Sequence, residues 1–191
     1  MHKLHSLNGE WRPEKHPCNS ARAPLYIWHL LTSPMPKLEK TVDIAAPPEI
    51  VWKIIADPSL VPKLYPHVVA VNPSHSRIVT VGSTVTITAK GIGRKVQASF
   101  TATEVIPNQK YSYKHLPDGF LDKYLCSITL EPSNKGTRLT ESIEYEAHAG
   151  YLGKEARKLV AHRLVKQNVL ESLKNVKEIA ELEEAPPSRS A

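Results

Sequence analysis

The sequence predicts an α+β fold built from one antiparallel sheet and a long helix near the end of the chain. Two observations carry this prediction. Segments of alternating apolar and polar residues follow one another from residue 84 to residue 147, separated by short turns rich in Gly, Pro and Asn. Between Gly153 and Glu184 the chain then contains no Pro or Gly, and apolar residues recur at helical spacing. So long a helix needs an equally long partner surface, and we expect it to cover the apolar face of the sheet.

The elements before the main block of strands are a strand and two short helices. Alternation over residues 38–44 predicts the strand. The segment Ala-Pro-Pro-Glu at residues 46–49 then suits the start of a helix, because proline is tolerated in a first turn and an early glutamate favours the helix dipole. Asp57 and Pro58 end this helix. A second short helix is expected over residues 60–65.

Six further strands are expected after the two helices. They are placed at residues 68–71, 84–89, 95–106, 111–115, 124–130 and 139–147. Because the connections are short, successive strands should pair antiparallel as a meander. Their alternation indicates a sheet with one apolar face and one face in water.

The two ends of the chain differ from this pattern. Residues 1–34 hold four of the nine histidines and have no sustained period. We interpret them as a disordered extension or as an over-long start, because the apolar run at residues 25–31 follows too long a charged region for a secretory signal. Residues 35–184 are predicted to form the domain, and residues 185–191 a frayed tail.

Composition excludes several classes of protein. The 191 residues carry a net charge of +6, yet no run of Lys or Arg is interleaved with aromatic residues, which disfavours nucleic acid as a partner. No apolar stretch reaches the ~20 residues that a membrane span needs. Cys18 and Cys126 lie in unlike contexts and do not form a disulfide framework, so a cytoplasmic location is the simpler expectation. The sequence does not indicate an oligomeric state.

Several short motifs, taken in order, resemble one known superfamily. They are APPEIVW at residues 46–52, IADP at 55–58, LYPHV at 64–68, VGS at 81–83, TEVIP at 103–107 and GTRLT at 136–140. Together they resemble the polyketide cyclase/dehydrase and lipid-transport superfamily, also called START-like, SRPBCC or helix-grip. The resemblance covers about residues 38–182. Many relatives have a tryptophan near the position of Tyr65, so its absence here leaves the subfamily open.

The resemblance implies a helix-grip fold, with a seven-stranded antiparallel sheet curved around the C-terminal helix and a hydrophobic cavity between them. It also implies a hydrophobic small-molecule ligand such as a lipid, a quinone or a polyketide-like compound. The superfamily includes lipid carriers, quinone-binding proteins and aromatase/cyclases, so membership does not decide between binding and catalysis.

Glu141 is the first candidate for the site. It lies between Leu139 and Ile143, on the face of the last strand that should point inward. A carboxylate in apolar surroundings needs a partner, or its pKa rises. The alternative is a structural role near the rim of the sheet.

Arg163 and Gln167 are the second candidates. At 100° per residue they share a helical stripe with Val160, and we expect this stripe to face the sheet and the ligand. Arg163 would then pair with Glu141 or bind an anionic or carbonyl group of the ligand. The alternative is that Arg163 extends outward to water. A rotated stripe should hold the helix to the fold; its members are Val169, Leu173, Val176 and Ala180.

Aromatic residues on the predicted inward faces of the strands form a third set. They are Phe100, Tyr111, Tyr113, Tyr124 and Tyr145. Aromatic walls with hydroxyl tips suit a flat, mostly apolar ligand that has a few oxygens. The alternative is ordinary packing of the core.

Histidines at strand ends complete the candidates. His115 and His148 could act as general acids or bases, or form hydrogen bonds at the mouth of a cavity. The alternative is that they have neither role. No His pair at helical spacing, no Cys/His cluster and no Gly-rich phosphate loop is present, so we expect neither a metal nor another cofactor.

Three functions therefore remain open from the sequence. The leading hypothesis is a non-catalytic protein that binds a hydrophobic small molecule, such as a lipid (a lipid-binding protein), a quinone or a polyketide-like compound. The second is a cyclase, aromatase or dehydratase with Glu141, Tyr145 or His115 as acid and base. The third is an interaction module that binds a protein or RNA through an exposed basic side. The residues of that side are Lys90, Arg94, Lys95, Lys154, Arg157 and Lys158.

Overall fold

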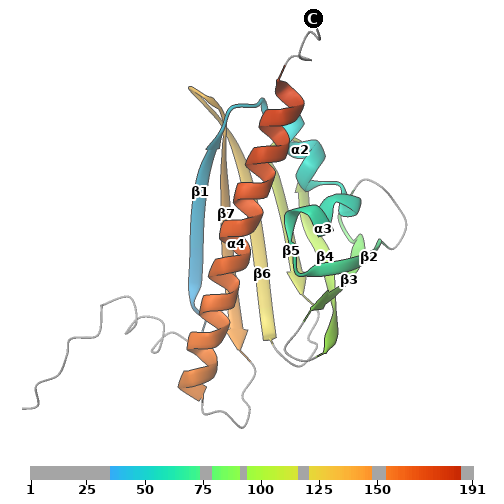
Figure 1. Ribbon diagram of the computed structural model, residues 1–191, viewed down its shortest axis with the longest axis vertical. Coiled ribbons are helices and arrows are strands. Elements are labelled where there is room, and N and C mark those ends of the chain that lie inside the picture. Colours follow the sequence, from blue (N-terminus) through green and yellow to red (C-terminus); the bar gives the residue numbers. More distant parts are fainter. Residues whose placement is uncertain (1–34, 74–78, 91–93, 116–120, 148–153, 186–191) are drawn as a thin grey trace, which may run out of the picture.

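A seven-stranded antiparallel sheet and three α-helices make up the fold that the computed structural model shows for residues 35–73, 79–90, 94–115, 121–147 and 154–185 (Figure 1). The strands are β1 (Lys37–Ile44), β2 (Val68–Pro73), β3 (Thr84–Lys90), β4 (Lys95–Ile106), β5 (Lys110–His115), β6 (Leu121–Ser133) and β7 (Gly136–Ala147). The helices are α2 (Pro48–Ile55), a 3-10 turn (Pro58–Leu60), α3 (Val61–Leu64) and α4 (Lys154–Glu184). Residues 1–34 and His148 lie outside the described ranges.

The order of strands in the sheet is β1-β7-β6-β5-β4-β3-β2. Strands β2 to β7 therefore form the predicted meander, and the first strand of the chain joins the last. Pairing of β1 with β7 runs from Lys37 opposite Glu144 to Ile44 opposite Thr137. The α+β, helix-grip fold predicted from the sequence is confirmed.

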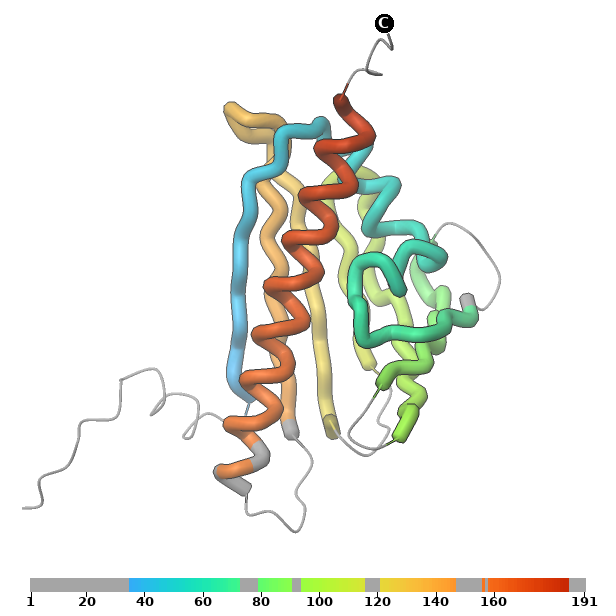
Figure 2. The backbone as a smooth tube through the Cα atoms, in the orientation of Figure 1, coloured from blue at the N-terminus to red at the C-terminus, as the bar shows by residue number. Residues whose placement is uncertain are grey.

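Helix α4 lies across the sheet beside β1 and β7, while α2 and α3 contact it from the other side (Figure 2). The face of α4 that packs against these elements is buried. Its residues are Ala161, Val165, Val169, Ser172, Leu173, Val176 and Ala180. Small side chains at three of these seven positions let the helix backbone approach its neighbours closely. The four residues predicted to hold the helix to the fold are confirmed as buried.

The prediction that the stripe of α4 with Val160, Arg163 and Gln167 faces the sheet is wrong. Val160 is 47% exposed, and Arg163 and Gln167 are exposed as well. The Gln167 amide donates a hydrogen bond to Glu171 on the same helix, at 3.0 Å. Apolar residues occur on more than one side of this helix. Their spacing alone therefore did not identify which side packs against the sheet, where alanine and serine are among the buried residues.

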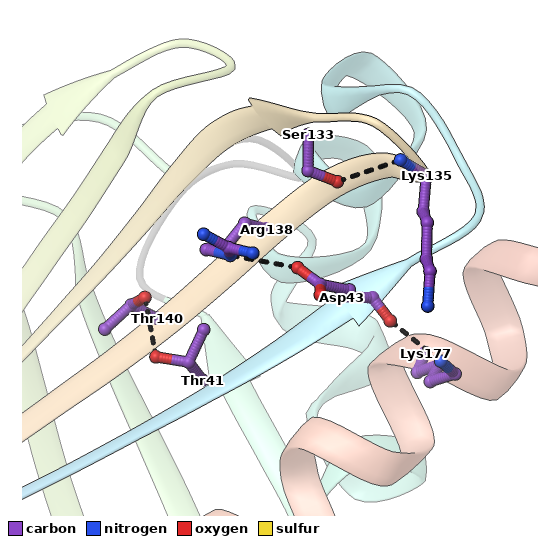
Figure 3. Close-up of polar contacts among 7 residues, drawn as sticks. All are labelled: Thr41, Asp43, Ser133, Lys135, Arg138, Thr140 and Lys177. Atoms are coloured by element: carbon purple, nitrogen blue, oxygen red, sulfur yellow. Dashed lines mark hydrogen bonds and ion pairs between the residues drawn. The ribbon is translucent and has the colours of Figure 1, made fainter.

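Polar contacts fasten the C-terminal half of α4 to the end of β1 (Figure 3). The Lys177 ammonium donates to the backbone carbonyl of Asp43 at 2.7 Å, and the Asp43 carboxylate accepts from Arg138 on β7 at 3.0 Å. One turn further along α4, the Glu181 carboxylate accepts from the backbone N–H of Ala45 at 2.9 Å. These contacts fix the helix at one end of the sheet.

Candidate functional site

Glu141 lies near the middle of β7 on the sheet face that α4 covers, as the sequence predicted. Its neighbours on that face, Leu139 and Ile143, are almost fully buried, and Glu141 itself is 1% exposed. A carboxyl group at such a position has lost its water and depends on the protein for hydrogen bonds.

The hydrogen bonds to Glu141 come from two different layers of the fold. The Tyr65 hydroxyl donates to Oε1 of Glu141 at 3.5 Å, and the thiol of Cys126 on β6 donates to the same oxygen at 3.6 Å. Tyr65 follows the last residue of α3, where the backbone becomes extended and Pro66 prevents the helix from continuing. This break in the helix lets the side chain reach the sheet.

Burial controls the protonation of this group of residues. It raises the pKa of Glu141 to about 7, while the hydrogen bonds from Cys126 and Tyr65 act in the opposite direction. Burial also raises the pKa of Cys126 and of Tyr65 well above their ordinary values, so both stay protonated at neutral pH. The site is therefore a set of hydrogen-bond donors whenever Glu141 holds its proton.

A cationic partner for Glu141 is not found in the part of the chain that the structure describes. Arg163 is exposed and Glu141 is buried, which contradicts the expected Glu141–Arg163 pair. Lys40 lies opposite Glu141 in the β1–β7 register, but no ion pair joins their side chains among the described residues. Glu141 is thus held by neutral donors, and this leaves its pKa high.

An aromatic wall on β4, β5 and β6 adjoins the carboxyl group. The rings of Phe100 and Tyr113 lie 5.7 Å apart, those of Phe100 and Tyr124 6.1 Å apart, and those of Tyr111 and Tyr113 5.2 Å apart. The register brings Tyr113 opposite Cys126, which links the wall to the hydrogen bond with Glu141. His115 is buried at the end of β5, with its ring 5.1 Å from Phe100.

The tyrosines of this wall keep some accessible surface although protein surrounds them. Burial raises the pKa of Tyr113 and of Tyr124 well above the ordinary value, yet both side chains are only half-buried. Their register partners, Cys126 and Tyr145, are buried, so we infer that this accessible surface lies on the inner face of the sheet. Such a surface, apolar with hydroxyl groups at its edge, is typical of sites for small apolar molecules.

Tyr145 on β7 belongs to the same face but has a separate hydrogen bond. It is fully buried, and its hydroxyl lies 2.7 Å from Nδ1 of His162 on α4. Burial and the charges of Lys166 and Lys40 lower the pKa of His162, so the imidazole is neutral at pH 7, and its tautomer decides which of the two groups donates. The pair joins the sheet to the N-terminal half of α4.

We expect Tyr145→Phe to lower the free energy of unfolding by about 1 kcal/mol, because it removes one net hydrogen bond and leaves the His162 nitrogen without this partner. Urea unfolding at pH 7 checks the value. Tyr111→Phe is the control, since no hydrogen bond of its hydroxyl occurs among the described residues, and it should change stability less. Equal losses in the two variants would contradict the role given to the Tyr145–His162 bond.

Sequence reasoning missed three residues of this region: Tyr65, His162 and Ser172. Tyr65 belongs to the LYPHV motif at residues 64–68, which was noticed as a family signal without a role for its hydroxyl. His162 and Ser172 lie on α4. Their place in this region becomes visible only when it is known which side of the helix faces the sheet.

No group of three or more His, Cys, Asp or Glu residues that could hold a metal ion occurs in the described ranges. None of the helices described there is long and apolar enough to cross a membrane.

The family described as polyketide cyclase / dehydrase and lipid transport matches residues 35–181 of this chain. This match spans well over half of the chain and all seven strands, so the protein belongs to that family. A comparison with curated proteins finds no significant match.

Solved structures with the same fold confirm the architecture. The Zhui aromatase/cyclase from Streptomyces sp. R1128 is 17% identical, with a TM-score of 0.72, over 81% of this chain and 98% of that one. TTHA0849 from Thermus thermophilus is 23% identical, with a TM-score of 0.64, over 80% and 100%. The di-domain ARO/CYC StfQ from the steffimycin biosynthetic pathway is 17% identical, with a TM-score of 0.66, over 78% of this chain. This chain spans about half of StfQ, 51% of its length.

Proposed function

We propose that this protein binds a neutral, hydrophobic small molecule that carries a hydrogen-bond-accepting oxygen, such as a ketone, a quinone or a polyketide-like compound. The observation that supports this most strongly is the buried carboxyl of Glu141, which lies among hydroxyl and thiol donors without a described cationic partner. The aromatic wall supplies the apolar part of the site.

The charge of the site selects the class of ligand. With Glu141 protonated, its O–H and the tyrosine hydroxyls can donate to a carbonyl oxygen. An anionic head group, as in a free fatty acid, would repel the ionised carboxylate. Lys40, opposite Glu141 in the register, forms no ion pair with it among the described residues. A neutral ligand is therefore favoured over an anionic one.

Ligand binding should weaken as the pH rises through about 7, because the ionised form of Glu141 can no longer donate a proton to the ligand oxygen. Native mass spectrometry of the purified protein identifies candidate ligands, and thermal stabilisation by a panel of neutral quinones, aromatic ketones and lipids measures binding at pH 6 and pH 8. Glu141→Gln keeps an N–H donor, so its binding should not change between the two pH values.

Glu144→Gln is the matched control, because Glu144 lies on the same strand with its side chain on the opposite, exposed face. It should retain the pH dependence of the wild type. Binding that is equally strong at both pH values in the wild-type protein would contradict the role of Glu141. Recovery of protein without ligand, together with no stabilisation by the panel, would contradict binding itself.

A second candidate function is catalysis of a cyclisation or dehydration at the same site. The observation that favours it is the pKa of Glu141 near 7, which suits a group that both gives and takes a proton at neutral pH. If the protein is such an enzyme, Glu141→Gln should lower turnover by roughly 100-fold or more while ligand affinity at pH 6 is retained. Unchanged turnover would exclude Glu141 as the acid or base.

A further inference from the structure

Three exposed cations gather where β3 ends and β4 begins. Lys90 and Lys95 lie directly opposite each other in the β3–β4 register, and Arg94 precedes Lys95. Like charges placed directly opposite on antiparallel strands repel each other and destabilise the pair. From residue 84 to residue 103 the sequence contains no Asp or Glu that could offset them.

Four other cations of the sheet have carboxylate partners, which these three do not have in the described part of the chain. Carboxylate partners lie at 3.1 Å for Lys37 with Glu39, 2.7 Å for Lys110 with Glu104, 3.6 Å for Lys123 with Glu146 and 3.0 Å for Arg138 with Asp43. Within the described ranges, no ion pair involves Lys90, Arg94 or Lys95. The positive charge here is thus available to an external partner.

Exposed apolar side chains lie at the same level as these cations. Val96 comes directly after Lys95 and lies on the inner face of β4, opposite Ala89. Val69 is the extra residue at the register shift between β2 and β3, next to the pair of Val68 with Ala89. Each of the two valines is 38% exposed. We call Lys90, Arg94, Lys95, Val69 and Val96 the hairpin patch.

The hairpin patch is connected to the candidate site through one strand. Val96, Ala98 and Phe100 alternate along the inner face of β4, and none of them is fully buried. The Phe100 ring contacts Tyr113 and Tyr124 of the aromatic wall. An apolar row therefore leads from the end of the sheet to the site.

We propose that the hairpin patch docks this protein onto an anionic lipid surface. Lysine and arginine are attracted to the negative potential of such a surface, and adjacent apolar side chains enter its boundary region. Docking at this end would place the apolar row of β4 against the lipid, so that a hydrophobic ligand could pass between the membrane and the site.

The neighbouring side chains favour a lipid surface over RNA. Binding of single-stranded RNA relies on aromatic side chains that stack with bases. The outer face of β3 and β4 beside the cations instead presents small polar residues, namely Thr86, Thr88, Gln97 and Ser99.

Vesicle flotation of the whole protein tests the proposal. Wild-type protein should float with vesicles in which phosphatidylserine is about a third of the lipid, and not with pure phosphatidylcholine. The triple variant Lys90→Gln/Arg94→Gln/Lys95→Gln should bind roughly 100-fold more weakly, at about fivefold for each cation. Its fold is not at risk, because removing repulsion between Lys90 and Lys95 leaves the pairing of β3 with β4 intact.

A matched triple variant separates the patch from net charge. Lys53→Gln/Lys135→Gln/Lys174→Gln removes the same charge from exposed positions on α2, the β6–β7 turn and α4, and should float like the wild type. Val96→Ser should weaken the binding that remains at high salt, where the contribution of the cations is screened.

Equal loss in both triple variants would overturn the proposal, as would the absence of flotation by the wild type. Binding of a single-stranded RNA, lost in the first triple variant without any binding to vesicles, would also overturn it in favour of RNA. The test is independent of the proposed ligand: Glu141→Gln should abolish the pH dependence of ligand binding and leave flotation unchanged.

Discussion

Replacing Gly136 with alanine should lower the free energy of unfolding by at least about 3 kcal/mol, because the new methyl group combines backbone strain with a clash. Gly136 begins β7 with a φ of +125°, which side chains rarely adopt. A Cβ atom there would lie 2.7 Å from the carbonyl oxygens of Ile44 and Ala46. Both are backbone atoms, one at the end of β1 and one in the connection from β1 to α2, so they cannot move aside as a flexible side chain would.

Gly82→Ala is the control for this prediction. Gly82 also has a positive φ, of +85°, but a Cβ atom at that turn would meet no atom within 4 Å. Its substitution therefore adds strain alone and should cost about 1 kcal/mol. Urea unfolding of both variants measures the difference. Equal losses of stability in the two variants would contradict the prediction, because they would show that a methyl group at position 136 adds no clash to the backbone strain.

The same contact explains one of the motifs that identified the family. Thr137 follows Gly136, is fully buried and donates a hydrogen bond to the carbonyl of Ala46 at 2.7 Å. The GTRLT motif at residues 136–140 therefore joins β7 to the connection between β1 and α2. The glycine and threonine of this motif were recognisable in the sequence. Their contact depends on the pairing of β1 with β7, which joins residues far apart in the chain, such as Thr41 and Thr140 with a separation of 99 residues.

The strands were predictable because their alternation has a period of two and short turns separate them. Glu141 and the tyrosines were placed on the inner face by the same alternation. This worked because a shift of one residue would have moved every apolar neighbour of Glu141 to the water side. The inward placement of these candidate residues on the sheet was therefore predictable from the sequence alone.

The part of the site on α4 was not predictable, for a physical reason. Helix α4 has exposed apolar residues such as Val160 and Leu164, and it buries Ala161 and Ser172. Close approach of the helix to the sheet favours small side chains at the contact, whereas a search for hydrophobic spacing favours large ones. Tyr65 escaped notice for a different reason: its hydroxyl meets Glu141 only through the tertiary packing of α3 over the sheet.

The buried carboxyl of Glu141 should make this protein less stable as the pH rises from about 4.5 to about 7. The ordinary pKa of 4.5 applies to the unfolded chain, and burial raises the folded value to about 7. Between these values the unfolded chain loses its proton while the native protein keeps it, so ionisation favours the unfolded state. The loss of stability is complete above about pH 7 and amounts to about 3 kcal/mol, at 1.36 kcal/mol for each pKa unit.

Glu141→Gln should remove this dependence, because the amide has nearly the shape of the protonated carboxyl and does not ionise. The variant should match the wild type near pH 4.5 and be more stable than it at pH 8, by up to about 3 kcal/mol. Urea unfolding of wild type, Glu141→Gln and the exposed-face control Glu144→Gln at both pH values measures the effect. A wild-type pH profile parallel to that of Glu141→Gln would show that Glu141 ionises as freely in the folded protein as in the unfolded chain. A buried charge at pH 7 without a cation would then need another source of stabilisation, and the preference for a neutral ligand would lose its physical basis.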